Sequence, residues 1–499
     1  MLHVGSRALV ALVLALGLGA CGGGGGGTPT DPRGTFDVVA LEGETLPGPT
    51  LGEVGQLPTG GGSGDPVMAL AAGGWSAAVV PTTNGSVPWI VMVLDPSGTQ
   101  VEALAAGALV PTLVDGTMDA VTRLWITGDG HVLAYVAIAG NTEGRTWALV
   151  SVEVAGGTAG APVHLASEFT GLVSVSLPGS MRSLDPADVI VDDNGRAWFL
   201  AHNDSDDPVL LSAPVDGSSL SAHARPGDAL PGAVTLVEIK SFGVEPAGTR
   251  FALVAGASDA TDRLVTGVPG GLTYDQVGAT GDTLFGGGVI AELHVGDPLI
   301  VYGGNNVVWH ARGSLSANDD LLLLASPLAG EILARRGGTA ASTGGGTFGT
   351  LRLLEQESDA TIPYFAASVI GSGNGITFAL YGVTSPTEAA DIAVWNGRSI
   401  GGTTLGTTFP SLDRPPLLAA ARNGDLAFAN VMADARSAVY WLIPFTGFIG
   451  AAISGDSTPM GDTWGAFAPT AFVTTAQGAI QWEGRLATAG TDGLFRFVR

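Results

Sequence analysis

Four acidic residues of the 499-residue chain recur in one kind of short turn, which contains glycine and in most copies proline. They are Glu44 in EGETLPGP, Asp228 in PGDALPGA, Asp282 in TGDTLFGG and Asp456 in SGDSTPMG. Carboxylates at equivalent positions of a ring would form a rim for a polyol or for calcium, a cation that prefers oxygen ligands. Turn chemistry favours a simpler interpretation, in which each carboxylate accepts N–H groups of its own turn. We therefore expect no cofactor, except calcium if the rim hypothesis is right.

The other chemically capable side chains form no recognisable catalytic or metal site. Asp204, Asp206 and Asp207 cluster in AHNDSDDP, but the segment lacks the ligand spacing and the distal glutamate of a calcium loop. We interpret it as a solvated acidic turn. Six histidines follow His3, none of them in an H-x-x-x-H pair, and we expect each to be a hydrogen-bonded structural residue. The sequence therefore assigns no catalytic residue and no metal ligand.

The strongest local signal surrounds Cys21, the single cysteine of the chain. A start that carries Arg7 is followed by the uncharged stretch ALVALVLALGLGA and then by the cysteine. A basic start, a short apolar core and small residues before a cleavage point are typical of a secretory signal. The tetrapeptide LGAC resembles the bacterial lipobox, in which the cysteine is acylated and becomes the new N-terminus. The resemblance predicts a signal peptide over 1–20 and a lipidated, palmitate-bearing Cys21; the alternative is a cleaved signal with an incidental cysteine.

A glycine-rich segment follows the cysteine. Residues 21–34 include six consecutive glycines and then Pro29 and Pro32, a composition that forms a flexible tether with a stiffer exit. Together with the lipobox, it predicts an extracytoplasmic protein that is held to the cell envelope by its N-terminal lipid. In a Gram-negative organism, Gly22 after the cysteine would favour the outer membrane or the cell surface.

Charge and composition exclude several classes of protein. The formal net charge is −25, and Lys240 is the single lysine, so a nucleic-acid partner is not expected. One cysteine allows neither an internal disulfide nor a cysteine-based zinc site. With Gly 77, Pro 29 and 45% hydrophobic residues, the chain favours many short strands joined by tight turns over long helices.

The elements that must position these residues are repeated hairpins. The segment AARNGDLAFANV from Ala420 has an apolar strand, a polar turn with glycine and a second apolar strand, and similar segments occur along the chain. Their turns lie at Gly74, Gly130, Gly195, Gly248, near Asp320, and at Gly375, Gly424 and Gly478. The mean spacing of about 58 residues is within the range of the longest propeller repeats. In this reading Asp425 is a solvated turn residue of the scaffold.

The acidic turns fall between the hairpins, with weaker copies at 107–111 and 175–180, so each unit has room for about four strands. Four strands per unit are the content of a propeller blade. We predict an all-β propeller of eight blades, with seven as the alternative, over residues 35–499. The N-terminal strand TFDVVALEG has no blade of its own and is expected to complete the last blade. The charge-free stretch 437–455 has the length of a membrane span, but Pro444 and two glycines favour two strands.

The combination of RNGDLAF with GDALPG resembles bacterial tandem-repeat proteins named for an NxxGxxAF motif. The match is loose, because Asn423 directly precedes Gly424 and only Ala427-Phe428 supplies the AF pair. The resemblance implies an extracytoplasmic repeat protein of unassigned activity. From the residues we expect a binding or scaffold module for protein or glycan partners. The alternatives are a carbohydrate-active hydrolase or lyase with its site at the channel mouth, and a structural envelope or adhesion protein.

Overall fold

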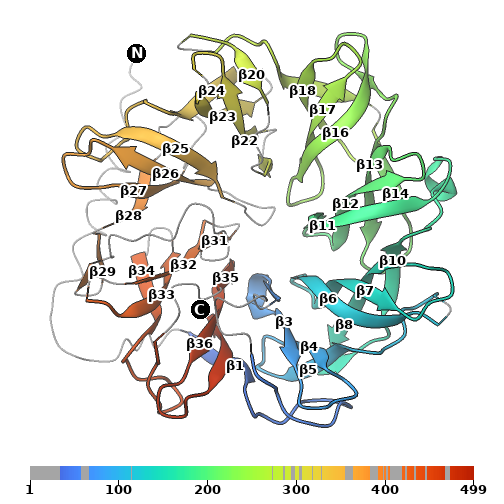
Figure 1. The fold of residues 1–499 in the computed structure, drawn as a ribbon, viewed down its shortest axis with the longest axis vertical. Coiled ribbons are helices and arrows are strands. Elements are labelled where there is room, and N and C mark those ends of the chain that lie inside the picture. The colour runs from blue at the N-terminus through green and yellow to red at the C-terminus, as the bar shows by residue number, and fades with distance from the viewer. Residues whose placement is uncertain are drawn as a thin grey trace, which may run out of the picture.

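A computed structural model of the chain contains eight blades of four or five strands, arranged in a ring (Figure 1). It describes residues 34–499 apart from 58–66, 114, 272, 285–286, 294–297, 303–305, 317, 327–328, 355–362, 383–390, 397, 401–402, 405–417, 422–423, 432–433, 444–446 and 467–472. Cys21 and the signal and tether segments therefore lie outside the described residues. The all-β propeller of eight blades that the sequence predicts is confirmed, and the seven-blade alternative is wrong.

The first four blades follow one another along the chain. Blade 1 contains β2 (Met68–Leu70), β3 (Ser76–Pro81), β4 (Trp89–Leu94) and β5 (Gln100–Ala105), with the 3-10 turn η1 (Ala72–Gly74). Blade 2 contains β6 (Thr117–Ile126), β7 (His131–Ala139), β8 (Trp147–Ala155) and β10 (Val163–Ser167), with the short β9 (Thr158–Ala159) beside β8. Blade 3 contains β11 (Met181–Val191), β12 (Arg196–Asn203), β13 (Pro208–Pro214) and β14 (Ser221–Ala224), preceded by η2 (Val173–Val175). Blade 4 contains β16 (Val234–Val244), β17 (Phe251–Ala257), β18 (Asp262–Gly267) and β19 (Tyr274–Ala279), with β15 (Ala229–Leu230) beside β16.

The second half of the ring is built in the same way. Blade 5 contains β20 (Ile290–Glu292) and β21 (Ile300–Tyr302), which both pair with β22 (Asn306–Gly313), then β23 (Asp320–Ser326) and β24 (Ala329–Arg335). Blade 6 contains β25 (Thr347–Leu353), β26 (Tyr364–Ile370), β27 (Phe378–Gly382) and β28 (Asp391–Trp395). A separate two-stranded ribbon, β29 (Ser399–Ile400) and β30 (Thr403–Thr404), precedes blade 7, which contains β31 (Leu418–Ala420), β32 (Leu426–Val431), β33 (Ser437–Ile443) and β34 (Gly447–Ile453). Blade 8 contains β35 (Val473–Ala476), β36 (Ala479–Arg485), β37 (Asp492–Val498) and β1 (Thr35–Leu41).

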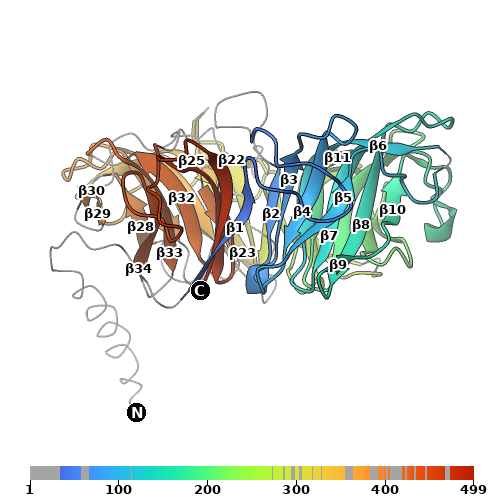
Figure 2. The same ribbon diagram turned by 90° about the horizontal axis from the view of Figure 1, so that it is seen from below.

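The middle strands of the blades carry continuous apolar runs. In β4, for example, all six residues of WIVMVL are buried. A strand that is buried on both faces has apolar residues at successive positions, because the side chains of neither face contact water. Each blade is covered on both faces by its neighbours in the ring (Figure 2), and the hydrophobic clusters combine side chains of successive blades. The core is therefore a series of packed layers between blades.

The N-terminal strand closes the ring, as expected. Strand β1 pairs antiparallel with β37 and forms the outermost strand of blade 8. The guanidinium of Arg496 on β37 is fully buried and lies 2.7 Å from Asp37 Oδ2 on β1. It also donates to the carbonyl oxygens of Leu94 and Asp95 in blade 1, at 3.1 and 3.0 Å. One side chain thus connects the first strand, the last strand and the neighbouring blade.

Antiparallel order defines two faces of the propeller. Turns between the first and second strands, such as Gly195 and Gly478, lie on one face, which we name the hairpin face. The connections from the outermost strand of one blade to the innermost strand of the next lie on the opposite face, together with the turns between second and third strands. We name this the crossing face. The chain enters β1 from the hairpin face, where the C-terminus also lies (Figure 2).

Three details differ from the sequence reading. The turns near Asp320 and at Gly375 join second and third strands, so these two hairpins lie one strand later in their blades than the other six. Asp425 is 1% exposed, and its Oδ2 accepts the N–H of Gly478 in the next blade at 3.2 Å. It is therefore a buried link between blades and not a solvated turn residue. Asn423 lies outside the described residues.

The charge-free stretch 437–455 forms β33 and β34, which pair as neighbouring strands of blade 7. The preference for two strands over a membrane span is therefore right. Within the described part of the chain, no helix has the length and apolar character needed to cross a membrane.

Candidate functional site

The four acidic turns share one backbone geometry. In each, the glycine before the acid has positive φ and donates its N–H to a carbonyl oxygen farther along the chain; Gly227, for example, has φ of 93° and donates to Leu236 O at 2.8 Å. The acid that follows accepts the N–H three residues before it: Leu41 N to Glu44 Oε2 is 3.2 Å, Arg225 N to Asp228 Oδ2 is 3.0 Å and Ala279 N to Asp282 Oδ2 is 2.7 Å. In Glu44, Asp228 and Asp282, these contacts match the interpretation in which the acid stabilises its own turn.

The structure does not gather the four acids at one point. Glu44 and Asp456 belong to the two crossings that flank blade 8, whereas Asp228 and Asp282 flank blade 4 on the opposite side of the ring. Local partners also occupy them: Tyr274 Oη donates to Asp228 Oδ2 at 3.0 Å, and Arg436 Nη1 lies 3.4 Å from Asp456 Oδ1. Among the described residues, no group of three or more His, Cys, Asp or Glu side chains has metal-site geometry.

A cavity of about 400 Å³ lies at the inner edge of blade 3. This volume is within the range of small-ligand sites. Its walls come from β11 and the end of β12: Ser183, Leu184, Asp185, Pro186, Asp188, Leu200 and His202. Two carboxylates, a hydroxyl and an imidazole therefore stand beside an apolar wall, and the exposed side chains of Ser183 and Asp185 leave the cavity open to solvent.

An irregular segment of β11 builds this cavity. Leu184 pairs with Ala201 and Val189 pairs with Phe199, so the four residues 185–188 stand opposite Leu200 alone. Pro186 within them has no N–H for the ladder, and bulges of this kind often redirect side chains next to functional sites. The bulge is held from blade 2, where Tyr135 Oη donates to Leu184 O at 3.1 Å. A similar but smaller irregularity occurs in β6, β16 and β25, whereas β2, β31 and β35 pair without one.

Burial and neighbouring charges shift the pKa values of Asp188, which lines the cavity, and of Tyr135, which supports it. Partial burial raises the pKa of Asp188 above its usual range, and the nearby negative charge of Asp185 raises it further. His202 and Arg123 act in the opposite direction on the same carboxyl. Burial, with the charges of Asp185 and Glu168, raises the pKa of Tyr135 to about 12, so this phenol remains a hydrogen-bond donor at neutral pH. The site thus contains one carboxyl group, that of Asp188, which is protonated more readily than an ordinary aspartate.

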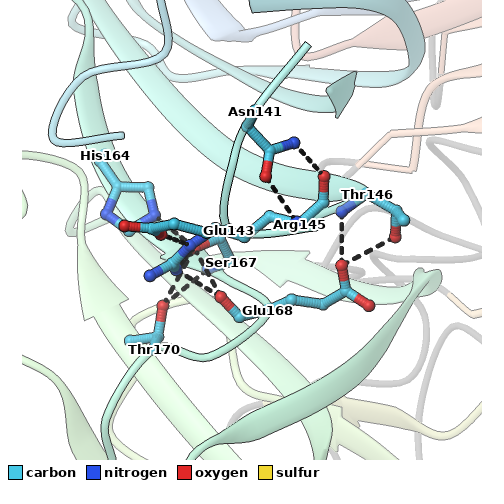
Figure 3. A network of polar contacts seen from close by, with 8 residues as sticks. All are labelled: Asn141, Glu143, Arg145, Thr146, His164, Ser167, Glu168 and Thr170. Atoms are coloured by element: carbon cyan, nitrogen blue, oxygen red, sulfur yellow. Dashed lines mark hydrogen bonds and ion pairs between the residues drawn. The ribbon is translucent and has the colours of Figure 1, made fainter. Parts of the chain in front are cut away.

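A network of polar contacts lies on the crossing face of blade 2 (Figure 3). Arg145, in the loop between β7 and β8, donates to Ser167 Oγ at 2.6 Å and to the carbonyl oxygen of Glu168. Its backbone is fixed by Asn141, whose Oδ1 accepts Arg145 N at 2.6 Å, while Glu168 Oε2 accepts Thr146 Oγ1 at 2.9 Å. These bonds connect the loop to the crossing that leads into β11.

His164 and Ser167 in this network resemble a base and a nucleophile but cannot act as such. His164 Nε2 lies 2.9 Å from Ser167 Oγ, and burial lowers the pKa of His164, with Arg145 acting in the same direction. However, Ser167 is 0% exposed and its hydroxyl is already bound by Arg145. A substrate carbonyl has no access to it, so the pair supports the loop.

One further serine has a nucleophile-like sequence context. Ser399 is the centre of a G-x-S-x-G pattern. A nucleophile elbow requires a strand that turns sharply into a helix. Ser399 instead begins β29 and pairs with Thr404 of β30, so it lies in a two-stranded ribbon. Among the described residues around Ser399, the strand-to-helix turn of a nucleophile elbow is absent.

The acidic loop after β12 and the described histidines have local roles. Asn203 Oδ1 accepts the N–H groups of Ser205 and Asp207, both at 2.9 Å, and Asp206 lies 3.7 Å from His202 Nδ1. His223 is 2% exposed, stacks on Trp198 and lies 2.7 Å from Ser212 Oγ. Burial lowers its pKa to about 4, so it is neutral at physiological pH. His294 lies outside the described residues.

Sequence reasoning missed Asp185, Asp188 and Tyr135. One signal was present, because a proline between two acids inside a strand-like segment indicates a bulge or an edge. The partner Tyr135 lies 49 residues from Leu184 and gave no such signal.

Comparisons with known proteins yield similar folds only. No protein-family model matches the chain, and no curated protein matches it. Among solved structures, puromycin hydrolase is 14% identical with a TM-score of 0.40, and the similarity covers 83% of this chain and 60% of that one. Saccharomyces cerevisiae Sqt1 is 10% identical with a TM-score of 0.35, covering 78% and 88% of the two chains. TolB from Acinetobacter baumannii is 10% identical with a TM-score of 0.29, covering 76% and 78%. The chain thus spans 60% of the length of puromycin hydrolase.

Proposed function

We propose that the chain is a lipid-anchored extracytoplasmic binding module whose ligand, a protein segment or a glycan, enters the cavity of blade 3. The observation that carries the proposal is the break in blade symmetry at β11, where the bulge 185–188 opens a cavity of about 400 Å³. Repeated blades supply the scaffold, and a ligand site is expected where one blade departs from the others. The signal-like N-terminus and the LGAC segment support the anchoring at Cys21.

Binding is tested with glycan and peptide arrays and a variant that fills the cavity. Ser183 is exposed and lines the cavity, so Ser183→Trp should abolish binding of any ligand that the full chain retains. Ser218→Trp is the matched control, because Ser218 is exposed in the same blade on the hairpin face. Retention of ligand by Ser183→Trp, or absence of any ligand, would contradict the proposal.

Anchoring is tested independently by mass spectrometry of the mature N-terminus. We expect the first peptide of the mature chain to begin at an acylated Cys21. The Cys21→Ser variant should carry no lipid. A mature chain that begins at an unmodified residue would overturn the anchoring part of the proposal and leave the cavity part standing.

A carbohydrate-active hydrolase or lyase is the second candidate. It is favoured by one observation, the raised pKa of Asp188 beside Asp185, because glycosidases combine a protonated with an ionised carboxyl. Incubation with soluble polysaccharides should then release reducing ends or unsaturated products. Asp188→Asn should stop this release while ligand retention on the array persists.

A further inference from the structure

The crossings between blades repeat one backbone position. In the seven crossings whose first turn the structure describes, one residue with positive φ donates its N–H to a carbonyl oxygen farther along the chain, at 2.7–2.9 Å. Six of these residues are glycines with φ between 78° and 95°: Gly43, Gly107, Gly227, Gly281, Gly337 and Gly455. The seventh is Phe169, which has φ of 60° and donates to Met181 O at 2.8 Å. An aromatic residue therefore takes the place of a glycine in the crossing from blade 2 to blade 3.

This conformation of Phe169 is strained, and burial does not offset the strain. A left-handed backbone is unfavourable for any residue with a Cβ, and a bulky residue rarely adopts it. Among the described non-glycine residues with positive φ, Phe169 is the only aromatic one. It is 50% exposed, and a Cβ added at any of the six equivalent glycines would meet nothing within 4 Å. Strained residues of this kind cluster at ligand sites, where they serve a role other than stability.

The ring of Phe169 is held in place by a fixed arginine. The guanidinium carbon of Arg145 lies 5.9 Å from the ring centroid, within the range of a cation–π contact. Arg145 is itself fixed, because its Nε lies 2.5 Å from Glu143 Oε2 and its Nη1 donates to the buried Ser167 Oγ at 2.6 Å (Figure 3). An exposed ring that is already positioned loses little conformational freedom when a ligand stacks on it.

The charges around the ring favour a neutral ligand. Arg145 already supplies the cation beside the ring, which disfavours a second one, and the carboxylates of Glu143 and Glu168 disfavour an anion. The Oε1 atoms of Glu143 and Glu168 have no hydrogen-bond partner among the described residues, so both can accept hydroxyl groups. A pyranose combines these requirements, since its C–H face stacks on an aromatic ring and its hydroxyls donate to carboxylates.

The crossing that carries Phe169 leads directly to the cavity of blade 3. Met181, whose carbonyl oxygen accepts the N–H of Phe169, is the first residue of β11. Ser183, two positions later, lines the cavity. The aromatic residue at a glycine position and the bulge 185–188 are thus two separate departures from the repeat on the path into one blade.

We propose that Phe169 is a stacking residue for a neutral glycan, with Glu143 and Glu168 accepting hydrogen bonds from its hydroxyls. The inference rests on the proposed binding function and selects the glycan from its two classes of ligand.

The test uses the full chain and soluble neutral oligosaccharides of glucose, mannose or xylose, with binding followed by calorimetry and proton NMR. Sugar C–H protons should shift upfield on binding, because they lie over an aromatic face, and added salt should not weaken the affinity. Phe169→Gly should bind at least tenfold more weakly and abolish the shift. Its midpoint of thermal unfolding should not fall, since glycine occupies this position in six other crossings.

Two further variants separate stacking from general effects of the substitution. Phe169→Trp should retain the affinity, because it keeps an aromatic face. Leu109→Ala, which shortens an exposed apolar side chain in the crossing from blade 1 to blade 2, should bind like the unmodified chain. A Phe169→Gly variant that keeps its affinity and loses stability would make Phe169 a structural residue and overturn the inference.

Other outcomes distinguish the inference from the function on which it rests. Glycan binding that depends on Ser183 and not on Phe169 would overturn the inference and leave the cavity function in place. Retention of peptides alone, again dependent on Ser183, would also overturn the inference while the binding function stands. Absence of any retained ligand would overturn both.

Discussion

Single side chains at the seams of the ring have roles that their sequence context hides. His223 is buried against Trp198 and accepts the N–H of Gly270 at Nδ1, at 3.4 Å, so the ring is neutral in the folded protein. Its pKa is lowered to about 4, whereas an unfolded histidine titrates near its ordinary value of 6.5. Protonation therefore favours the unfolded chain in this pH window.

We predict that the free energy of unfolding falls as the pH is lowered from about 6.5 toward 4. The histidine contribution is fully present above the unfolded pKa and is lost as the pH approaches the folded pKa. Its size is up to about 3 kcal/mol, since each unit of pKa difference corresponds to about 1.4 kcal/mol. Urea unfolding across this range measures it, and His223→Gln should remove the difference. A variant with the same pH slope as the unmodified chain would contradict the assignment.

Residue roles were only partly predictable. The sequence placed Glu44, Asp228 and Asp282 in turns, and the structure shows the turn bonds that the simpler interpretation required. Asp425 was misjudged because burial depends on the blade that follows it, through Gly478. The cavity acids were missed because pairing across β11 and β12, which a sequence does not reveal, decides where residues 185–188 bulge.

At the scale of elements, the crossing turns depend on positive φ. Gly227 has φ of 93°, and a Cβ at this position would meet nothing within 4 Å. Gly227→Ala should therefore destabilise the fold by about 1–2 kcal/mol through backbone strain alone. Gly85 is equally open but lacks positive φ, so Gly85→Ala should be neutral or slightly stabilising. Equal midpoints of thermal unfolding for the two variants would show that the turn geometry is wrong.

The β11 bulge is an element with one identifiable support. Removal of the Tyr135 hydroxyl in Tyr135→Phe should cost about 1 kcal/mol and speed amide exchange over residues 184–188. Tyr381→Phe is the control. Tyr381 lies in blade 6 and also donates to a backbone carbonyl, Ala341 O, at 3.2 Å. Hydrogen exchange with mass spectrometry compares the two. Unchanged exchange at the bulge in Tyr135→Phe would mean that blade 2 does not hold it.

Hairpins were well predicted as elements, and their places within blades less well. Six of the eight predicted turns join first and second strands, whereas the turns near Asp320 and at Gly375 join second and third strands. Both kinds of turn consist of two apolar strands around a polar tip. Only the hydrogen-bonded order of the sheet distinguishes them.

For the whole molecule, closure of the ring depends on residues far apart in sequence. Arg496 is 0% exposed and joins Asp37 to blade 1, so Arg496→Met should lower the free energy of unfolding by about 3 kcal/mol, through loss of a buried pair. Arg485→Met changes a half-exposed arginine of the same blade, 3.9 Å from Asp492, and should change stability by about 0–1 kcal/mol. Denaturant unfolding compares them, and equal losses would contradict the role of Arg496 in closure.

Closure and blade number followed from the sequence because repetition was visible. The sequence showed a first strand without a blade and a last repeat that ends early, so the first strand was expected to complete the last blade. Strand β1 does pair with β37 of blade 8. The orientation relative to a membrane could not be predicted from the sequence, because it depends on the face from which the chain enters β1. If Cys21 carries the proposed lipid, we expect the hairpin face, from which the chain enters β1, to lie nearer the membrane than the crossing face.

Energy transfer to the membrane tests this orientation most directly. The single cysteine is blocked when acylated, so Leu109→Cys and Val268→Cys each add one reactive thiol, on the crossing face and the hairpin face. Each variant is labelled with a donor and reconstituted through its own lipid into vesicles that contain acceptor lipids. With the hairpin face toward the membrane, we predict stronger transfer from the label at position 268 than from the label at position 109. Equal or reversed transfer would contradict a propeller that presents its crossing face outward.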